Sequence, residues 1–110
     1  MNKINNKTKG LLKEKLVAHY LIKKGWTIVF QNKKILGVEI DILAEKNREQ
    51  ILVEVKSIQT ADQIENILKE KQKGRLKKAA ESLCEASNFS IQLFLATVDN
   101  QNQIDFFEIS

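Results

Sequence analysis

The chain has little of several residue types on which metal sites, disulfides and membrane spans are built. Cys84 is its only cysteine, which excludes an intrachain disulfide and a thiolate metal cluster and makes a reducing cytoplasm the expected setting. His19 is its only histidine, so a mechanism that needs two imidazoles is excluded and any bound metal must be held by oxygen. The longest apolar run, Leu93 to Ala96, is far too short to span a membrane, and nothing points to export.

The chain also lacks proline, internal repeats and low-complexity linkers. Its 110 residues, 43% hydrophobic and 29% charged, match an ordinary globular protein. We therefore expect one domain over residues 1–110, with residues 1–7 frayed.

Charge is unevenly distributed around a net value of +4. Residues 1–34 carry nine lysines and one acid, residues 35–68 carry seven acids and three bases, and residues 69–78 carry six bases and one acid. Two basic blocks around an acidic middle suit a protein that holds a polyanion at its sides and a cation at its centre. A composition that only keeps the chain soluble remains the alternative.

Hydrophobic periodicity predicts an α/β fold with a central mixed sheet flanked by helices. A helix over residues 8–24 ends at Gly25, and a second helix ends near Ser87. The start of the second helix is open, because Ile64, Ile67 and Leu68 belong either to it or to a separate turn. The predicted strands cover residues 26–30, 37–45, 50–57, 90–98 and 103–109, and the helix between the third and fourth allows a parallel crossover.

Charged residues interrupt the predicted hairpin of residues 37–57. Because side chains alternate along a strand, Glu39 and Asp41 should share one face and Val38, Ile40 and Ile42 the other. Glu39 and Asp41 would then make one face of this strand charged, whereas a buried hairpin is expected to be apolar.

The next strand completes a possible metal site. Glu54 and Lys56 share a face, and a turn at residues 46–48 would bring Asp41 close to Glu54. Opposed carboxylates are unfavourable without a cation, so Mg²⁺ or Mn²⁺ with Lys56 beside it is one interpretation. A solvent-facing charged hairpin is the other.

Each predicted helix carries one polar residue on its apolar stripe. Glu14 falls on the row of Val17, Ala18 and Leu21, and Gln72 falls on the stripe of the second helix. Each is either a structural hydrogen bonder or part of the site.

Taken in order, these motifs resemble the YraN-like family of bacterial proteins predicted to be endonucleases. The matching segments are Glu14-(three residues)-Ala18-His19-Tyr20-Leu21, Gly25, Gly37 to Ala44, Val53-Glu54-Val55-Lys56, Lys71-Gln72-Lys73, Arg75-Leu76 and Ala79-Ala80. That family looks like a small branch of the PD-(D/E)XK restriction-endonuclease-like superfamily, related to Holliday-junction resolvases. The resemblance implies an αβββαβ core with an extra C-terminal strand.

The resemblance also implies roles for individual residues. Asp41, Glu54 and Lys56 match the catalytic core, with Asp41 and Glu54 as ligands of Mg²⁺ or Mn²⁺. Glu14 matches a first-helix carboxylate that joins the catalytic and metal-binding set, and Glu39 matches a supporting acid. Gln72 matches a second-helix catalytic glutamine.

The implied function is metal-dependent cleavage of nucleic acid, with DNA as the expected substrate and its shape as the feature recognised. A homodimer is one arrangement that would allow paired cuts. Phosphate contacts are expected from the basic residues Lys69, Lys71, Lys73, Arg75, Lys77 and Lys78. Two other classes stay open: a nucleic-acid-binding module that does not cut, and a protein-interaction domain.

Overall fold

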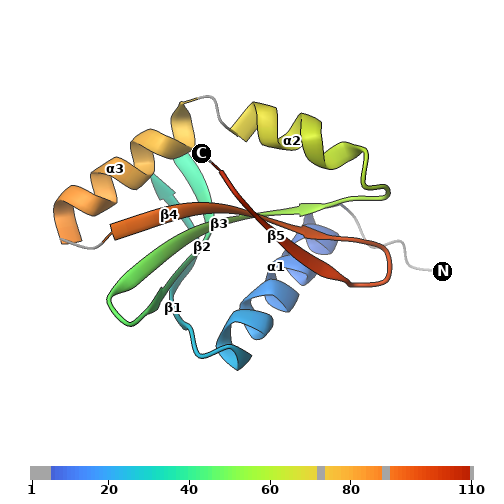
Figure 1. The fold of residues 1–110 in the computed structure, drawn as a ribbon, viewed down its shortest axis with the longest axis horizontal. Helices are drawn as coiled ribbons and strands as arrows, with labels where there is room; N and C mark the ends of the chain where they lie inside the picture. Colours follow the sequence, from blue (N-terminus) through green and yellow to red (C-terminus); the bar gives the residue numbers. More distant parts are fainter. Residues whose placement is uncertain (1–5, 72–73, 88–89, 110) are drawn as a thin grey trace.

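A five-stranded mixed sheet lies between helices in the computed structural model, which describes residues 6–71, 74–87 and 90–109 (Figure 1). The elements are α1 (Asn6–Lys23), β1 (Thr27–Ile35), β2 (Val38–Lys46), β3 (Glu49–Ser57), α2 (Gln63–Lys71), α3 (Arg75–Ser87), β4 (Ser90–Val98) and β5 (Ile104–Glu108). The predicted α/β architecture with a C-terminal extra strand is confirmed. The segment expected to be frayed, residues 1–7, lies partly outside the described residues, and Asn6 already begins α1.

The strands follow one another in the sheet in chain order, β1-β2-β3-β4-β5. Only the β3–β4 pair is parallel, and it runs in continuous register from Glu49↔Ser90 to Ser57↔Val98. The predicted crossover is therefore confirmed. It contains two helices, because Gly74 has a φ of 78° and separates α2 from α3.

Two tight turns set the register of the first three strands. Leu36 and Gly37 have φ values of 51° and 75°, and Asn47 and Arg48 have values of 51° and 66°. Two consecutive positive values are the type I′ geometry that matches the twist of an antiparallel hairpin. The predicted 46–48 turn is confirmed, whereas β1 runs to Ile35 and is longer than the predicted 26–30 strand.

The helices bury opposite faces of the sheet. Val17, Ala18 and Leu21 of α1 pack with strand residues on one face, and Leu76 and Ala79 of α3 pack on the other. Figure 1 shows α1 on one side of the sheet and α2 and α3 on the other. Glu14, on the inner side of α1, is thereby held against the strands.

Strand β2 loses its alternation at Asp41. Ile42 packs in the α1 core, whereas Ile40 packs in the α3 core, so the prediction that both share one face is wrong. Across from Asp41, between the register pairs on either side, Asn32 of β1 has a φ of 53°, outside the strand region. The left-handed backbone of Asn32 thus lies at the level where the side chains of β2 change faces.

The C-terminal end of α1 is fixed by its neighbour strand. Gly25, with a φ of 94°, follows the helix as predicted, and Lys46 Nζ donates a 2.7 Å hydrogen bond to the carbonyl oxygen of Lys24. This contact holds α1 in register along β2.

Candidate functional site

Asp41 is anchored by the backbone of the neighbouring strand. The β2–β3 register ends with the pair Ile42↔Val53, and beyond it the amide of Val55 donates a 2.8 Å hydrogen bond to Asp41 Oδ2. A side chain thus takes the place of a backbone acceptor at the end of the ladder.

Glu54 and Lys56 lie beside this anchor on β3. Glu54 Oε1 is 3.9 Å from Lys56 Nζ, a long ion pair. The Glu54 side chain is 12% exposed and that of Lys56 is 44% exposed, so the carboxylate is sheltered while the ammonium reaches solvent. A long, half-exposed pair leaves the ammonium free to move toward a bound anion.

Burial and neighbouring charge raise the pKa of Asp41 to about 6. Loss of hydration contributes most, followed by the negative charge of Glu54; the Val55 hydrogen bond and the charge of Lys56 act in the opposite direction. The predicted proximity of Asp41, Glu54 and Lys56 therefore has a measurable electrostatic consequence.

Glu14 faces the same cluster from α1. Its side chain is buried, and its Oε1 atom has no hydrogen-bond partner within the part of the chain that the structure describes. Its pKa is raised to about 7, first by burial and then by the charges of Asp41, Glu39 and Glu54, with a further contribution from a hydrogen bond to Asp41. The four acids named from the sequence therefore lie close enough for the charges of Asp41, Glu39 and Glu54 to act on Glu14.

These side chains do not form a complete preformed metal shell. Within residues 6–71, 74–87 and 90–109, no group of three or more His, Cys, Asp or Glu side chains is placed to hold a metal ion together. Mg²⁺ commonly uses only one or two protein carboxylates and keeps several waters. Hard oxygen donors, excess negative charge and the unpartnered Glu14 Oε1 therefore fit a hydrated divalent cation at Asp41 and Glu54, with Glu14 outside the direct ligands.

The second-helix residues are only partly described. Gln72 and Lys73 lie outside the described residues, as do the side chains of Lys71 and Arg75. Lys69 is exposed, with its Nζ 3.7 Å from Glu65 Oε1, whereas Lys77 is half-buried and Lys78 exposed on α3. Lys69, Lys77 and Lys78 belong to helices on the face of the sheet opposite α1, so they are not gathered around Glu14.

Two neighbours of the site were missed in the sequence. The Val55 amide gives no sequence signal, and Thr97 becomes relevant only because the parallel register places it beside Lys56. Thr97 is almost fully buried, and its Oγ1 has no hydrogen-bond partner among the described residues. Only knowledge of the β3–β4 register could have identified it.

Comparison with known sequences confirms the resemblance drawn from the motifs. The model of "Uncharacterised protein family UPF0102", the YraN family, matches residues 13–109. A UPF0102 protein of Natranaerobius thermophilus is 33% identical over 109 residues, covering 92% of this chain and 91% of the relative. One of Caldanaerobacter subterraneus subsp. tengcongensis is 44% identical over 57 residues, covering 52% of this chain but only 47% of the relative, so the chain spans about half of that protein.

Solved structures share the fold at low sequence identity. An XisH family protein from Nostoc punctiforme has a TM-score of 0.54 and 20% identity, covering 90% of this chain and 99% of its own. A repair endonuclease from Pyrococcus abyssi has a TM-score of 0.51 and 11% identity, covering 93% of this chain and 42% of its own. The predicted restriction-endonuclease-like fold is confirmed. Among the described helices, none has the length and apolar character needed to cross a bilayer.

Proposed function

We propose that this chain, which belongs to the uncharacterised protein family UPF0102, is a metal-dependent nuclease. It would hydrolyse phosphodiester bonds of nucleic acid and select DNA by its structure. The observation that carries this proposal is the convergence of Glu14 from α1 with Asp41 and Glu54 from two strands, beside an ammonium that reaches solvent. The fold shared with a repair endonuclease supports it.

Asp41 and Glu54 are the residues that would hold Mg²⁺ or Mn²⁺. When bound, the ion would supply an activated water and neutralise charge on the phosphate. The Val55 amide holds Asp41 where the β2–β3 pairing ends, so its orientation does not depend on the ion. Burial of Glu54 keeps its carboxylate close to β3, which would hold the cation where the β2–β3 pairing ends.

Lys56 would orient the attacking water and stabilise negative charge on the phosphoryl oxygens. Its half-exposed side chain can swing from Glu54 to a substrate phosphate without breaking a strong contact. Glu14 Oε1, which has no hydrogen-bond partner in the part of the chain that the structure describes, would accept a hydrogen bond from a water and so position solvent beside the ligands. Glu39 adds negative charge, and Gln72 remains a predicted contact to Lys56 or the phosphate.

The basic residues of α2 and α3 would contact phosphates without reading bases. Lys69 and Lys78 are exposed and available for such contacts. Recognition by backbone contacts alone selects the shape of the nucleic acid. A cytoplasmic setting and a homodimer that makes paired cuts belong to the same proposal.

A cleavage assay tests the proposal directly. Branched, flapped, single-stranded and duplex DNA are incubated with Mg²⁺, Mn²⁺ or EDTA, with wild type compared with Asp41→Asn and Lys56→Ala. We expect metal-dependent products from wild type and a loss of at least about a hundredfold in each variant. Lys33→Ala, on the edge strand β1, is the matched control and should retain activity. Equal products from wild type and both site variants would eliminate the mechanism.

A nucleic-acid-binding module that does not cut is the second candidate. The lack of a three-ligand group among the described residues favours it. It predicts salt-dependent DNA binding that survives Asp41→Asn and yields no metal-dependent product. The same assay, run beside a binding measurement, separates the two functions.

A further inference from the structure

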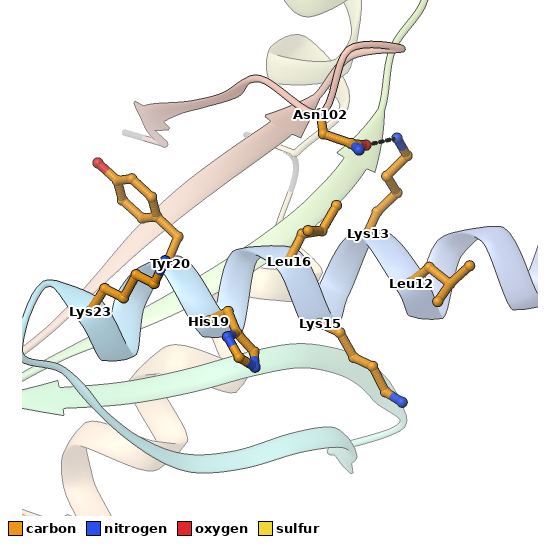
Figure 2. Close-up of a pocket in the computed structure, with 8 residues that line it drawn as sticks. All are labelled: Leu12, Lys13, Lys15, Leu16, His19, Tyr20, Lys23 and Asn102. Atoms are coloured by element: carbon orange, nitrogen blue, oxygen red, sulfur yellow. Dashed lines mark hydrogen bonds between the residues drawn. The ribbon is translucent and has the colours of Figure 1, made fainter.

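The outer side of α1 carries an apolar stripe that the site does not use. Leu12, Leu16 and Tyr20 repeat every four residues and are 46%, 37% and 38% exposed. They lie in a groove of about 730 Å³, here called the α1 groove, whose other lining residues are Lys13, Lys15, His19, Lys23 and Asn102 (Figure 2). Exposed apolar residues that cluster in one groove indicate a binding surface more strongly than scattered ones.

The charge of the α1 groove identifies what it can bind. Lys13, Lys15 and Lys23 line it, and no carboxylate is among its lining residues. Two copies of this surface facing one another would bring their lysines together, which disfavours self-association through it. A polyanion with apolar surfaces between its charges is the complementary ligand.

A second hollow continues the groove past Tyr20. This aromatic pocket, of about 300 Å³, is lined by Tyr20, Leu21, Lys24, Trp26, Glu49, Ile51, Gln92, Phe94 and Phe106. The rings of Tyr20 and Phe106 lie 5.5 Å apart, and Lys24 Nζ lies 5.6 Å from the Tyr20 ring centroid. Four aromatic rings with a few polar groups form the type of pocket that holds a small planar ligand.

The chemistry of the aromatic pocket suits a nucleobase. A base offers a π-face to Tyr20 or Trp26 and hydrogen-bonding edges to the exposed side chains of Gln92 and Glu49. Bases within a duplex are stacked on their neighbours, so only an unpaired base can enter.

The groove starts beside the carboxylate cluster. Lys13, at one end, donates a hydrogen bond to Asn102 Oδ1 at 2.8 Å (Figure 2). It donates a second one to the Asp99 carbonyl oxygen at 3.1 Å. The next residue, Glu14, turns inward toward Asp41. From Glu14 to Lys24 the helix rises about 15 Å, enough for about four stacked nucleotides of one strand.

We propose that the α1 groove and the aromatic pocket bind an unpaired nucleic-acid strand, with its phosphates along Lys13, Lys15 and Lys23 and one base among the aromatic rings. This inference rests on the proposed function, since it names the unpaired part of that substrate. Strand binding can nevertheless be measured without cleavage.

Trp26, the only tryptophan, is a built-in reporter for the aromatic pocket. The chain is titrated with hexathymidylate in EDTA at low salt, and Trp26 emission is followed together with the anisotropy of a labelled copy of the oligonucleotide. We expect saturable quenching by the single strand and none by a blunt duplex long enough to stay paired at low salt. Quenching by neither, or equally by both, would overturn the proposal.

Tyr20 variants test the stacking contact. Tyr20→Ala should weaken hexathymidylate binding roughly tenfold, because an aromatic platform is lost, whereas Tyr20→Phe should stay close to wild type. Thermal unfolding of both variants reports folding, and Tyr20→Phe keeps the test valid if Tyr20→Ala is unstable. Stacking on this ring would be contradicted if Tyr20→Ala folds and binds hexathymidylate with the same affinity as Tyr20→Phe and wild type.

Paired charge reversals locate the bound strand. Lys15→Glu with Lys23→Glu should weaken binding about tenfold, while Lys33→Glu with Lys34→Glu, on β1 and outside the lining of the groove, should change it less than about twofold. Equal losses would indicate diffuse attraction by net charge and refute the groove. Competition by a twelve-residue polyglutamate peptide as effective as that by the oligonucleotide would identify a protein-docking surface and also refute it.

The outcomes separate this inference from the proposed function. Specific quenching by hexathymidylate without any metal-dependent product would leave the groove established and the nuclease excluded. Metal-dependent products without Trp26 quenching would leave the nuclease and remove the groove.

Discussion

The amide of Val55 donates a 2.8 Å hydrogen bond to Asp41 Oδ2, so a side chain of β2 is fastened to the backbone of β3 where their ladder ends. Two strands that diverge at this level would otherwise leave the Val55 amide unpaired. The same contact holds Asp41 near Glu54, whose negative charge raises the pKa of Asp41, and near Glu14, whose own pKa the charge of Asp41 raises. Strand geometry and site chemistry therefore depend on one carboxylate.

Replacement of Asp41 should separate its two roles. Asp41→Asn keeps an oxygen that accepts from Val55 and removes a charge, whereas Asp41→Ala leaves the amide without an acceptor. We expect Asp41→Ala to be less stable than Asp41→Asn by about 1–3 kcal/mol. Urea unfolding of both variants at pH 8 measures the difference.

Mg²⁺ should no longer raise the melting temperature of either Asp41 variant, whatever the stability of that variant without the ion. Glu45→Gln, farther along β2 and away from the cluster, is a suitable control. Equal unfolding free energies for Asp41→Ala and Asp41→Asn would show that the Val55 contact contributes nothing.

The apo protein should become less stable as the pH rises from about 4 to 7. Glu14 and Asp41 have pKa values of about 7 and about 6 in the folded chain, above their ordinary values of 4.5 and 3.8. The folded state thus binds protons more tightly than the unfolded state, and this contribution to stability is present at low pH and lost as the two groups ionise. Urea midpoints measured in EDTA across this range provide the test.

Glu14→Gln should remove much of that pH dependence. An uncharged amide of the same shape avoids the burial of a carboxylate near Asp41, and we expect a gain of about 3 kcal/mol at pH 8 in EDTA. Glu85→Gln, on the exposed surface of α3, should change the stability curve little. A Glu14→Gln curve that parallels wild type would contradict the assigned environment.

Mg²⁺ should stabilise the folded chain, and more strongly at pH 8 than at pH 5. A cation that binds only the folded state adds about 1.4 kcal/mol when its free concentration is about ten times its dissociation constant. Protonated Asp41 cannot serve as a ligand, so acid should reduce the effect. Thermal unfolding with Mg²⁺, against sodium at equal ionic strength, measures it.

The absence of any Mg²⁺-specific rise in melting temperature at pH 8 would argue against a cation at Asp41 and Glu54. Wild type and Asp41→Asn should be compared in the same buffers. A rise that persists in Asp41→Asn would place the cation elsewhere.

Thr97→Val should stabilise the protein by about 1 kcal/mol, because it replaces a buried hydroxyl that has no hydrogen-bond partner among the described residues with a methyl group of similar shape. Thr97→Ala should instead destabilise it by about 1 kcal/mol, since a cavity replaces the removed atoms. Denaturant unfolding of the two variants distinguishes packing from hydrogen bonding. A loss of stability in Thr97→Val would show that the hydroxyl has a partner in solution.

Much of the architecture could be predicted because its signals are local. The spacing of apolar residues predicted the helices and strands, and the turn at residues 46–48 set the register that brings Asp41 near Glu54. Antiparallel register depends on a few neighbouring residues, so a short sequence window contains it.

The remainder depended on contacts between distant segments. The break in alternation at Asp41 lies opposite Asn32 of the adjacent strand, which has a left-handed backbone. The position of Thr97 beside Lys56 requires the parallel pairing of β3 with β4. The split between α2 and α3 at Gly74 was missed although a glycine marks it, because the apolar stripe continues on both sides. Gln72 lies outside the described residues, and its role stays a prediction.

Strand β1, one of the two edge strands of the sheet, bears on whether the protein aggregates at high concentration. Its outward edge offers backbone groups on which another chain could assemble, the hazard that leads exposed strands to aggregate. Lys33 and Lys34 place like charges along that edge, and the left-handed backbone of Asn32 bends it away from a flat template. We therefore expect the lysines and the irregular backbone at this edge to disfavour pairing with a strand of another chain.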